Sequence, residues 1–151
     1  MNSKLAGIIL LTLGVASANA VAGEGEGPIE RPYLGQKPPG SAPEPFAPGI
    51  ITTKGWEYGG VFSPDMREFY VLKRDENETT WQHVYRYRDG EWHDKVLWER
   101  QGTPFIAPDG QTMHIGRAYK VRDADGWSET KRLGGAFELF RIMRHTASAR
   151  T

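Results

Sequence analysis

The residues that could carry out chemistry are scattered along this chain of 151 residues, and they do not form a catalytic or metal-binding motif. There is no cysteine, so disulfides, thiolate metal sites and a lipid-attachment cysteine are excluded. No two histidines have the H-x-x-x-H spacing of helical metal ligands. The histidines are His83, His93, His114 and His145. The sequence therefore predicts no metal site and no cofactor.

Serine and carboxylate chemistry is equally sparse. A serine nucleophile needs a strained elbow such as G-x-S-x-G, whereas Ser63 stands in a Ser-Pro-Asp turn. The stretch Asp123-x-Asp125-Gly126 offers oxygen ligands but lacks the rest of a calcium loop, so we predict a hairpin turn there. A glycosidase needs only a positioned pair of carboxylates, and their spacing in this sequence selects no pair. The sequence names no catalytic residue and leans towards a protein that is not an enzyme.

Two similar stretches, 44 residues apart, organise the chain. The first runs from Phe62-Ser63-Pro64-Asp65 into the segment 69–72, and the second from Ala107-Pro108-Asp109-Gly110 into 112–115. The offset lies within the roughly 40–45-residue period of a four-stranded propeller blade. Segment 69–72 reads Phe-Tyr-Val-Leu and is apolar at every position, as expected for a strand that is covered on both faces.

Each stretch is predicted to belong to one four-stranded antiparallel blade, blade 1 over residues 55–100 and blade 2 over residues 101–135. Asp89-Gly90 and Asp125-Gly126 are two-residue hairpin signals before the outer strands. Blade 1 is longer by about eight residues, which we assign to an inserted loop around 75–81. The predicted strands are 56–62, 68–73, 83–88 and 92–98 in blade 1, and 103–107, 112–115, 118–122 and 127–133 in blade 2.

The two ends of the chain depart from this pattern. Residues 1–20 combine a lysine, an apolar run and small residues at the end, which predicts a secretory signal peptide cleaved after Ala20. Residues 21–54 are rich in glycine and proline, which favours an extended arm lying against the folded body. Residues 136–151 are predicted to be a partial third blade, and their first part could be an amphipathic helix or an entry strand.

Charge and cysteine usage limit the partners and the compartment. The formal net charge is zero, which argues against a nucleic-acid partner. The apolar run near the N-terminus is short for a membrane span, so we expect no stable membrane anchor after cleavage. Export without cysteine fits a periplasmic or secreted bacterial protein.

The two turns and the segment Asp125-Gly126-Trp127-Ser128 through Leu133-Gly134 resemble the WD40-like propeller repeat of TolB-type proteins. That repeat typically reads F-S-P-D-G-K, followed later by G-W-S-x-P-x-x-L-G. The resemblance extends over residues 32–144, and three positions depart from it: Met66 replaces a glycine, Thr130 a proline and Arg150 an aspartate. Whole family members have about six blades, which implies a truncated, fragmentary or oligomerising form here. The resemblance also implies a protein–protein interaction platform, and related propellers are accessory domains of hydrolases.

The sequence thus predicts an all-β fold, an incomplete β-propeller of about two four-stranded antiparallel blades plus a partial third, with an extended Pro-rich N-terminal arm. The predicted function is an exported, non-catalytic binding module for a protein or glycan partner, and Trp81 is the candidate partner contact. Two alternatives stay open: a sialidase- or glycosidase-like propeller or hydrolase accessory domain, and a truncated fragment without independent function. Self-association into a homo-oligomer would complete the propeller by pooling blades.

Overall fold

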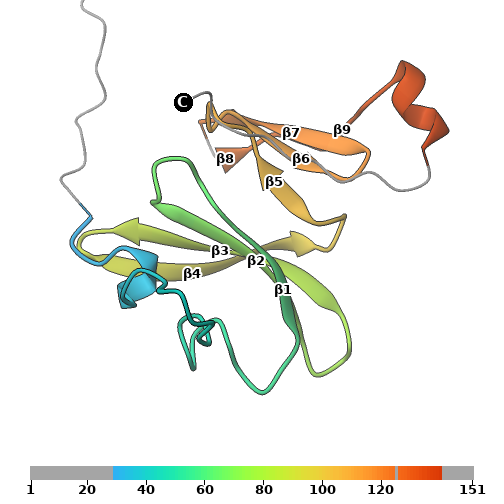
Figure 1. The fold of residues 1–151 in the computed structure, drawn as a ribbon. Helices are drawn as coiled ribbons and strands as arrows, with labels where there is room; N and C mark the ends of the chain where they lie inside the picture. The colour runs from blue at the N-terminus through green and yellow to red at the C-terminus, as the bar shows by residue number, and fades with distance from the viewer. Residues whose placement is uncertain (1–28, 125, 141–151) are drawn as a thin grey trace, which may run out of the picture.

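The computed structural model describes residues 29–124 and 126–140 and is mostly β structure, arranged in two antiparallel sheets (Figure 1). The first sheet has the order β1-β2-β3-β4, and the second has the order β5-β6-β7-β8 with β9 paired to β7. The first sheet comprises β1 Glu57–Phe62, β2 Glu68–Arg74, β3 Thr80–Arg88 and β4 Glu91–Glu99. The second comprises β5 Pro104–Ile106, β6 Thr112–Ile115, β7 Ala118–Asp123, β8 Gly126–Trp127 and β9 Lys131–Arg132. The all-β prediction and the grouping of the strands into two successive antiparallel sheets are confirmed.

The first sheet follows from its turn chemistry and its apolar strand. Asp89 and Gly90 both have positive φ values, 53° and 81°, as the predicted two-residue hairpin requires. All four residues of segment 69–72 in β2 are buried, with at most 6% of each exposed. Because side chains alternate along a strand, this segment presents an apolar surface to both sides of the sheet.

The second sheet corrects one predicted strand. The outer strand 127–133 was expected to be continuous, but it is divided into β8 and β9. Ser128 lies in the break and bonds Val121 of β7 twice: its backbone N–H donates to the Val121 carbonyl (2.9 Å), and its Oγ accepts from the Val121 N–H (3.1 Å). A side-chain oxygen therefore replaces a backbone partner at this point, which interrupts the regular pairing. Asp125 of the predicted hairpin lies outside the described residues.

The extra length of the first sheet is also distributed differently from the prediction. The hairpin β2–β3 has strands of seven and nine residues, against four and six in β6 and β7. The connecting turn is confined to residues 75–79. The inserted residues therefore lengthen a hairpin, whose backbone pairing continues to Arg74 and Thr80. Trp81 belongs to β3 rather than to a loop.

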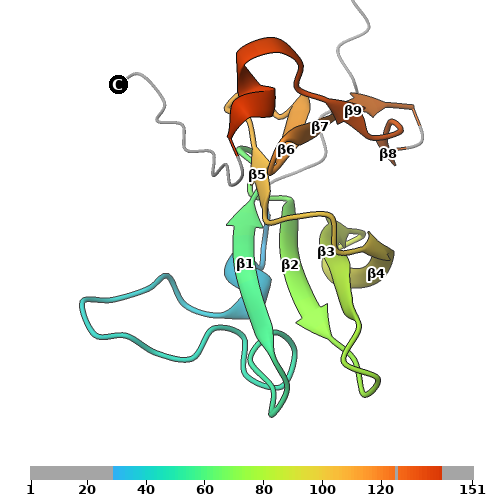
Figure 2. The same ribbon diagram turned by 90° about the vertical axis from the view of Figure 1, so that its right-hand side faces the viewer.

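One face of the first sheet is covered by residues of the N-terminal arm, beside β1 in Figure 2. The described part of the arm contains the 3-10 turn η1 Tyr33–Gly35. Aromatic edge contacts join Phe46 to Phe62 and Phe69 at centroid distances of 6.0 and 5.1 Å. Trp92 of β4 donates its indole N–H to the carbonyl of Arg31 (2.7 Å). The buried members of this cluster are Leu34, Ala47, Ile51, Phe69, Val71 and Tyr85.

The opposite face of the first sheet packs against the second sheet. Tyr70 and Met113 are fully buried there, one from each sheet, and Trp127 donates to the Tyr70 hydroxyl (2.9 Å). The buried members of this second cluster are Tyr70, Val84, Ile106, Met113 and Ile115. The first sheet is thus enclosed between the arm on one side and the second sheet on the other.

The sheets approach each other closely at Gly59. Gly59 has a φ of 67° and lies at an irregularity in the β1–β2 pairing. A Cβ at this position would lie 2.9 Å from Thr103 Cγ2, just before β5. Only glycine satisfies both the backbone conformation and the space.

Gly59→Ala is expected to lower the free energy of unfolding by about 2–3 kcal/mol, the sum of left-handed strain and a steric conflict. Gly90→Ala is the matched control, because Gly90 has a φ of 81° but a Cβ there would meet nothing within 4 Å. The free energy of unfolding of this control should fall by only about 1 kcal/mol, from backbone strain alone. Denaturant unfolding monitored by tryptophan fluorescence measures both, and equal losses would contradict the close approach to Thr103.

The remaining predictions concern the ends of the chain. Residues 1–20, the predicted signal peptide, lie outside the described residues, as do residues 141–151. The segment after Gly134 forms the 3-10 turn η2 Gly135–Leu139, with Phe137 and Leu139 exposed. Within residues 29–124 and 126–140, no helix has the length and hydropathy needed to cross a bilayer.

Candidate functional site

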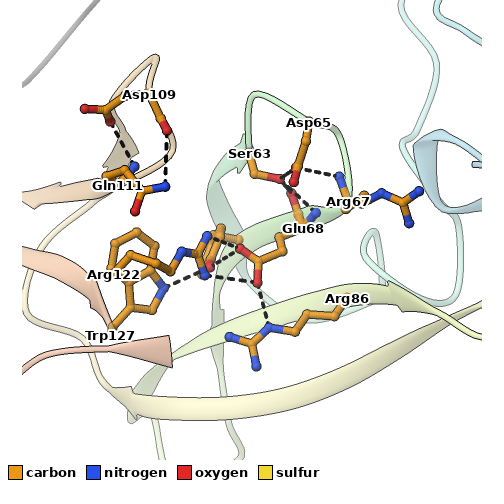
Figure 3. Close-up of polar contacts among 10 residues, drawn as sticks. Ser63, Asp65, Arg67, Glu68, Arg86, Asp109, Gln111, Arg122 and Trp127 are labelled. Carbon is orange, nitrogen blue, oxygen red and sulfur yellow. Dashed lines mark hydrogen bonds and ion pairs between the residues drawn. The ribbon is translucent and has the colours of Figure 1, made fainter. Parts of the chain in front are cut away.

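A polar cleft opens between the two sheets where their Pro-Asp turns lie side by side (Figure 3). Its volume is about 310 Å³. The turns are close enough that a Cβ on Gly110 would lie 3.9 Å from the Pro64 ring. The charged residues that line the cleft are Asp65, Arg67, Glu68, Arg86, Arg88, Asp109 and Arg122.

The two turns that form the rim make the same hydrogen bonds. In the first turn, the N–H of Met66 donates to the Ser63 carbonyl (2.9 Å), and Asp65 Oδ1 accepts from the N–H two residues later (3.0 Å). In the second turn, the N–H of Gly110 donates to the Ala107 carbonyl (2.8 Å), and the Asp109 carboxylate likewise accepts from the N–H two residues later (2.8 Å). Met66 takes the glycine place with a φ of 61°, against 70° at Gly110. Each aspartate carboxylate therefore stabilises its own turn by accepting a hydrogen bond from a backbone N–H within that turn.

Ser63 has a structural place in the first turn. It is 3% exposed, its Oγ donates to Asp65 Oδ1 (2.5 Å) and the backbone N–H of Glu68 donates to this Oγ (2.9 Å). These bonds join the turn to the start of β2. Ser63 lines the cleft, and its Oγ is engaged by these bonds within the turn.

Glu68 forms the floor of the cleft and links the two sheets. Its Oε1 accepts from Arg86 Nε (2.7 Å), within the first sheet. Its Oε2 accepts from Arg122 Nη2 (2.5 Å), from the second sheet, and from the Tyr70 hydroxyl (2.6 Å). The side chains of Glu68 and Arg86 are only 13% and 15% exposed. We call these four residues, Glu68, Tyr70, Arg86 and Arg122, the Glu68 clasp.

The clasp fixes the protonation states of its members. Burial alone would raise the pKa of Glu68, but hydrogen bonds from Arg122, Tyr70 and Arg86 and the charge of Arg122 outweigh it. The pKa of the Glu68 carboxyl therefore lies below its ordinary value. Burial and the neighbouring Glu68 charge raise the pKa of Tyr70 to about 12. At neutral pH Glu68 is a carboxylate and Tyr70 a neutral phenol.

This arrangement bears on the glycosidase alternative. Sialidases use a tyrosine nucleophile, and Tyr70 stands beside a carboxylate and two arginines as such a mechanism would require. However, Tyr70 is 0% exposed, and its hydroxyl is occupied by Glu68 and by the Trp127 indole N–H. A substrate has no access to that oxygen. The clasp stabilises the contact between the sheets and presents no accessible nucleophile at Tyr70.

A second cavity of about 400 Å³ adjoins the polar cleft and shares Arg86 and Arg88 with it. Arg86 faces His93 across the β3–β4 pairing, and Val84 faces Lys95. Val84 is buried against the second sheet, so alternation along β3 and β4 places Arg86, Arg88, His93 and Lys95 on that same side. We call Arg86, Arg88 and Lys95 the basic row. Asp89 and Asp94 also line this cavity.

Trp81, the predicted partner contact, lies at the far end of β3 from the basic row. It pairs with Lys73 and Glu99, and its indole N–H donates to Asp75 Oδ2 (2.8 Å), which lowers the pKa of that carboxyl. Its side chain is half-buried. The structure does not bring Trp81 to the cleft, and its role as a contact stays a prediction.

The three histidines within the described residues lie on different strands. His83 bonds Asp94 through Nδ1 (3.0 Å), on the face of the first sheet opposite the basic row. His114 lies beside the Phe105 ring in the second sheet. Among the described residues there is no group of three or more histidine and carboxylate side chains that could hold a metal ion.

The clasp was missed by reasoning from the sequence, although its two turns were found. Glu68 and Arg122 are 54 residues apart, and no motif relates them. One usable signal exists: Glu68 occupies the first position of β2, directly before the apolar segment 69–72. A carboxylate at the start of a strand covered on both faces needs a cationic partner, and Arg86 of the first sheet and Arg122 of the second supply it.

No family model, no curated protein and no solved structure matches this chain.

Proposed function

We propose that this chain is an exported binding module, built from an open pair of propeller-type blades, that docks a protein partner on the polar cleft and the basic row beside it. The observation that carries the proposal is the cleft itself. It is a polar hollow between two sheets, and its rim is formed by turns from both of them. A site built by two packed sheets is held rigidly, which favours recognition because little order is lost on binding.

The shared turn geometry supports the propeller-type part of the proposal. Both turns make corresponding hydrogen bonds, and the following strands correspond as well: Tyr87 N–H donates to the Arg67 carbonyl, and Arg122 N–H donates to the Gln111 carbonyl, both at 2.8 Å. Arg67 and Gln111 are again 44 residues apart. The two sheets also share one buried cluster, which contains Tyr70 and Met113, and this supports an arrangement of neighbouring blades.

Two features favour a binding role over catalysis at this cleft. The carboxylate on its floor is ionised and engaged with two guanidinium groups, whereas a glycosidase acid needs a raised pKa. Arg88 on its rim is exposed, and the basic row beside it leaves cationic donors that face solvent. Arginine on a rigid rim is common at protein interfaces.

A position-specific crosslinking experiment tests the proposal. A photoactivatable phenylalanine replaces Gln111 on the cleft rim, Trp81 at the far end of β3, or exposed Lys37 in the arm as the control. The full chain is produced with residues 1–20 intact, and the periplasmic fraction of the source organism is illuminated. We expect a discrete protein adduct from position 111 and none from position 37.

The other outcomes have definite meanings. An adduct from position 81 alone would move the contact to the far end of the first sheet and overturn the cleft proposal. No adduct at any position, or a chain retained in the cytoplasm, would contradict a periplasmic binding module. Hydrolysis of glycosides by the purified chain would favour the carbohydrate-active alternative.

A further inference from the structure

The basic row has cationic donors that the described residues do not engage. Arg86 uses Nε for Glu68, which leaves its two terminal nitrogens. Arg88 and Lys95 are exposed and make no hydrogen bond or ion pair with another described residue. Two exposed carboxylates lie close to the row: Asp89 in the hairpin turn, and Glu91, which faces Arg88 across the β3–β4 pairing. No ion pair joins either of them to a described residue of the row, and the Asp94 carboxylate is hydrogen-bonded to His83 on the other face of the sheet.

The spacing of the row is that of an extended chain. Arg86 and Arg88 are alternate residues of β3 and point to the same side, so they repeat at about 6.8 Å along the strand. Lys95 lies diagonally across from Arg86 on β4, near enough for a long side chain to reach the same ligand. An extended peptide presents its own alternate side chains with the same repeat.

We propose, on the basis of the binding role argued above, that the basic row recognises an extended acidic peptide segment with carboxylates at alternate positions. Two successive carboxylates pair with Arg86 and Arg88, and a third carboxylate or the chain end meets Lys95. Guanidinium groups bind carboxylates through two parallel hydrogen bonds, which makes the recognition directional. The negative charge of Glu68 is already compensated by its two arginines. The carboxylates of the ligand therefore pair with the unengaged nitrogens of the basic row.

The shape of the site agrees with this ligand. The cavity of about 400 Å³ continues into the cleft of about 310 Å³ through the shared residues Arg86 and Arg88. A single small oxyanion would use one arginine and leave most of this length empty. A segment of several residues uses the whole row.

Two labelled peptides of equal composition and net charge provide the test, measured by fluorescence anisotropy on the full mature chain. One alternates aspartate with serine, and the other places its aspartates in one block. We expect the alternating peptide to bind about tenfold more tightly, because only its carboxylates repeat with the row. Equal affinity would overturn the recognition of spacing.

Arg88→Gln and Lys54→Gln form a matched pair of variants. Each removes one exposed cation, but Lys54 lies before β1, at the opposite end of the first sheet from the row. We expect Arg88→Gln to weaken binding of the alternating peptide about tenfold and Lys54→Gln to leave it within about twofold. Similar losses of affinity in both variants would show only general charge attraction, and the proposal of a specific site would be wrong.

Two competitors identify other sources of negative charge. If inorganic phosphate or a sulfated oligosaccharide displaces the peptide at lower concentrations than unlabelled alternating peptide does, the row is an oxyanion or glycan site and the peptide assignment is wrong. If neither peptide binds but position 111 still gives a crosslink, this inference alone is overturned. If neither peptide binds and position 111 gives no crosslink, the proposed function is overturned as well.

Discussion

Glu68→Gln is expected to lower the free energy of unfolding by about 3 kcal/mol at pH 7, because it removes the carboxylate that two partly buried arginines share. Glutamine keeps the shape of glutamate, so the loss of stability is caused by the missing charge and not by a change in side-chain volume. Urea unfolding of the full chain measures the effect. Glu76→Gln is the control, since Glu76 is exposed in the β2–β3 turn, and it should change stability by less than about 0.5 kcal/mol.

The stability of the wild type and that of Glu68→Gln should depend differently on acid pH. The pKa of Glu68 is lower in the folded chain than its ordinary value of 4.5, so its stabilisation is complete above that pH and is lost as the pH falls through the folded value. The difference between the wild type and Glu68→Gln should therefore be constant from neutral pH to about pH 5 and shrink below pH 4.5. A difference that persists undiminished at about pH 2.5 would show that charge is not the cause.

Ile51→Ala is expected to destabilise the protein by about 3 kcal/mol, as for other aliphatic core residues truncated to alanine. Ile51 is 5% exposed in the cluster that the arm forms with β2 and β3. The adjacent Ile50 is 47% exposed and is a control of the same residue type, for which less than about 1 kcal/mol is expected. Thermal unfolding by circular dichroism compares them.

The result of this comparison decides whether the arm is part of the folded unit. A large loss in Ile51→Ala with one cooperative transition would show that residues 29–54 unfold together with the sheets. Equal, small losses in both variants would show that the arm contributes little to stability. The second outcome would leave the face of Phe69 and Val71 to be covered by something else.

Much of the fold could be predicted because its signals are local. The turns at Pro64-Asp65 and Pro108-Asp109 depend on backbone contacts within a few residues, and Asp89-Gly90 supplies the φ values that its hairpin needs. Segment 69–72 is apolar on both faces, and it is covered on both. Such features are determined by residues that are neighbours in the chain.

The errors and omissions arise where distant residues decide the outcome. The outer strand of the second sheet is divided because Ser128 bonds Val121, and nothing in the pattern of apolar residues distinguishes this serine. The clasp joins Glu68 to Arg122 across the sheet contact, so it becomes visible only when the sheets are packed together. The sequence predicts Trp81 in a loop, because counting residues does not divide the extra length of the hairpin between its strands and its turn.

The coverage of the first sheet by the arm has a consequence for the order of folding. Successive strands β1 to β4 are joined by short turns, so they close small loops and can pair quickly. The arm, by contrast, reaches its partners across long separations, 57 residues from Glu30 to Tyr87 and 61 from Arg31 to Trp92. Loop closure over such distances costs more entropy, and these contacts have no surface to meet until β3 and β4 are paired. A chain that emerges N-terminus first therefore presents its arm before the surface that receives it exists. The arm is therefore synthesised before the two sheets but packs against them last.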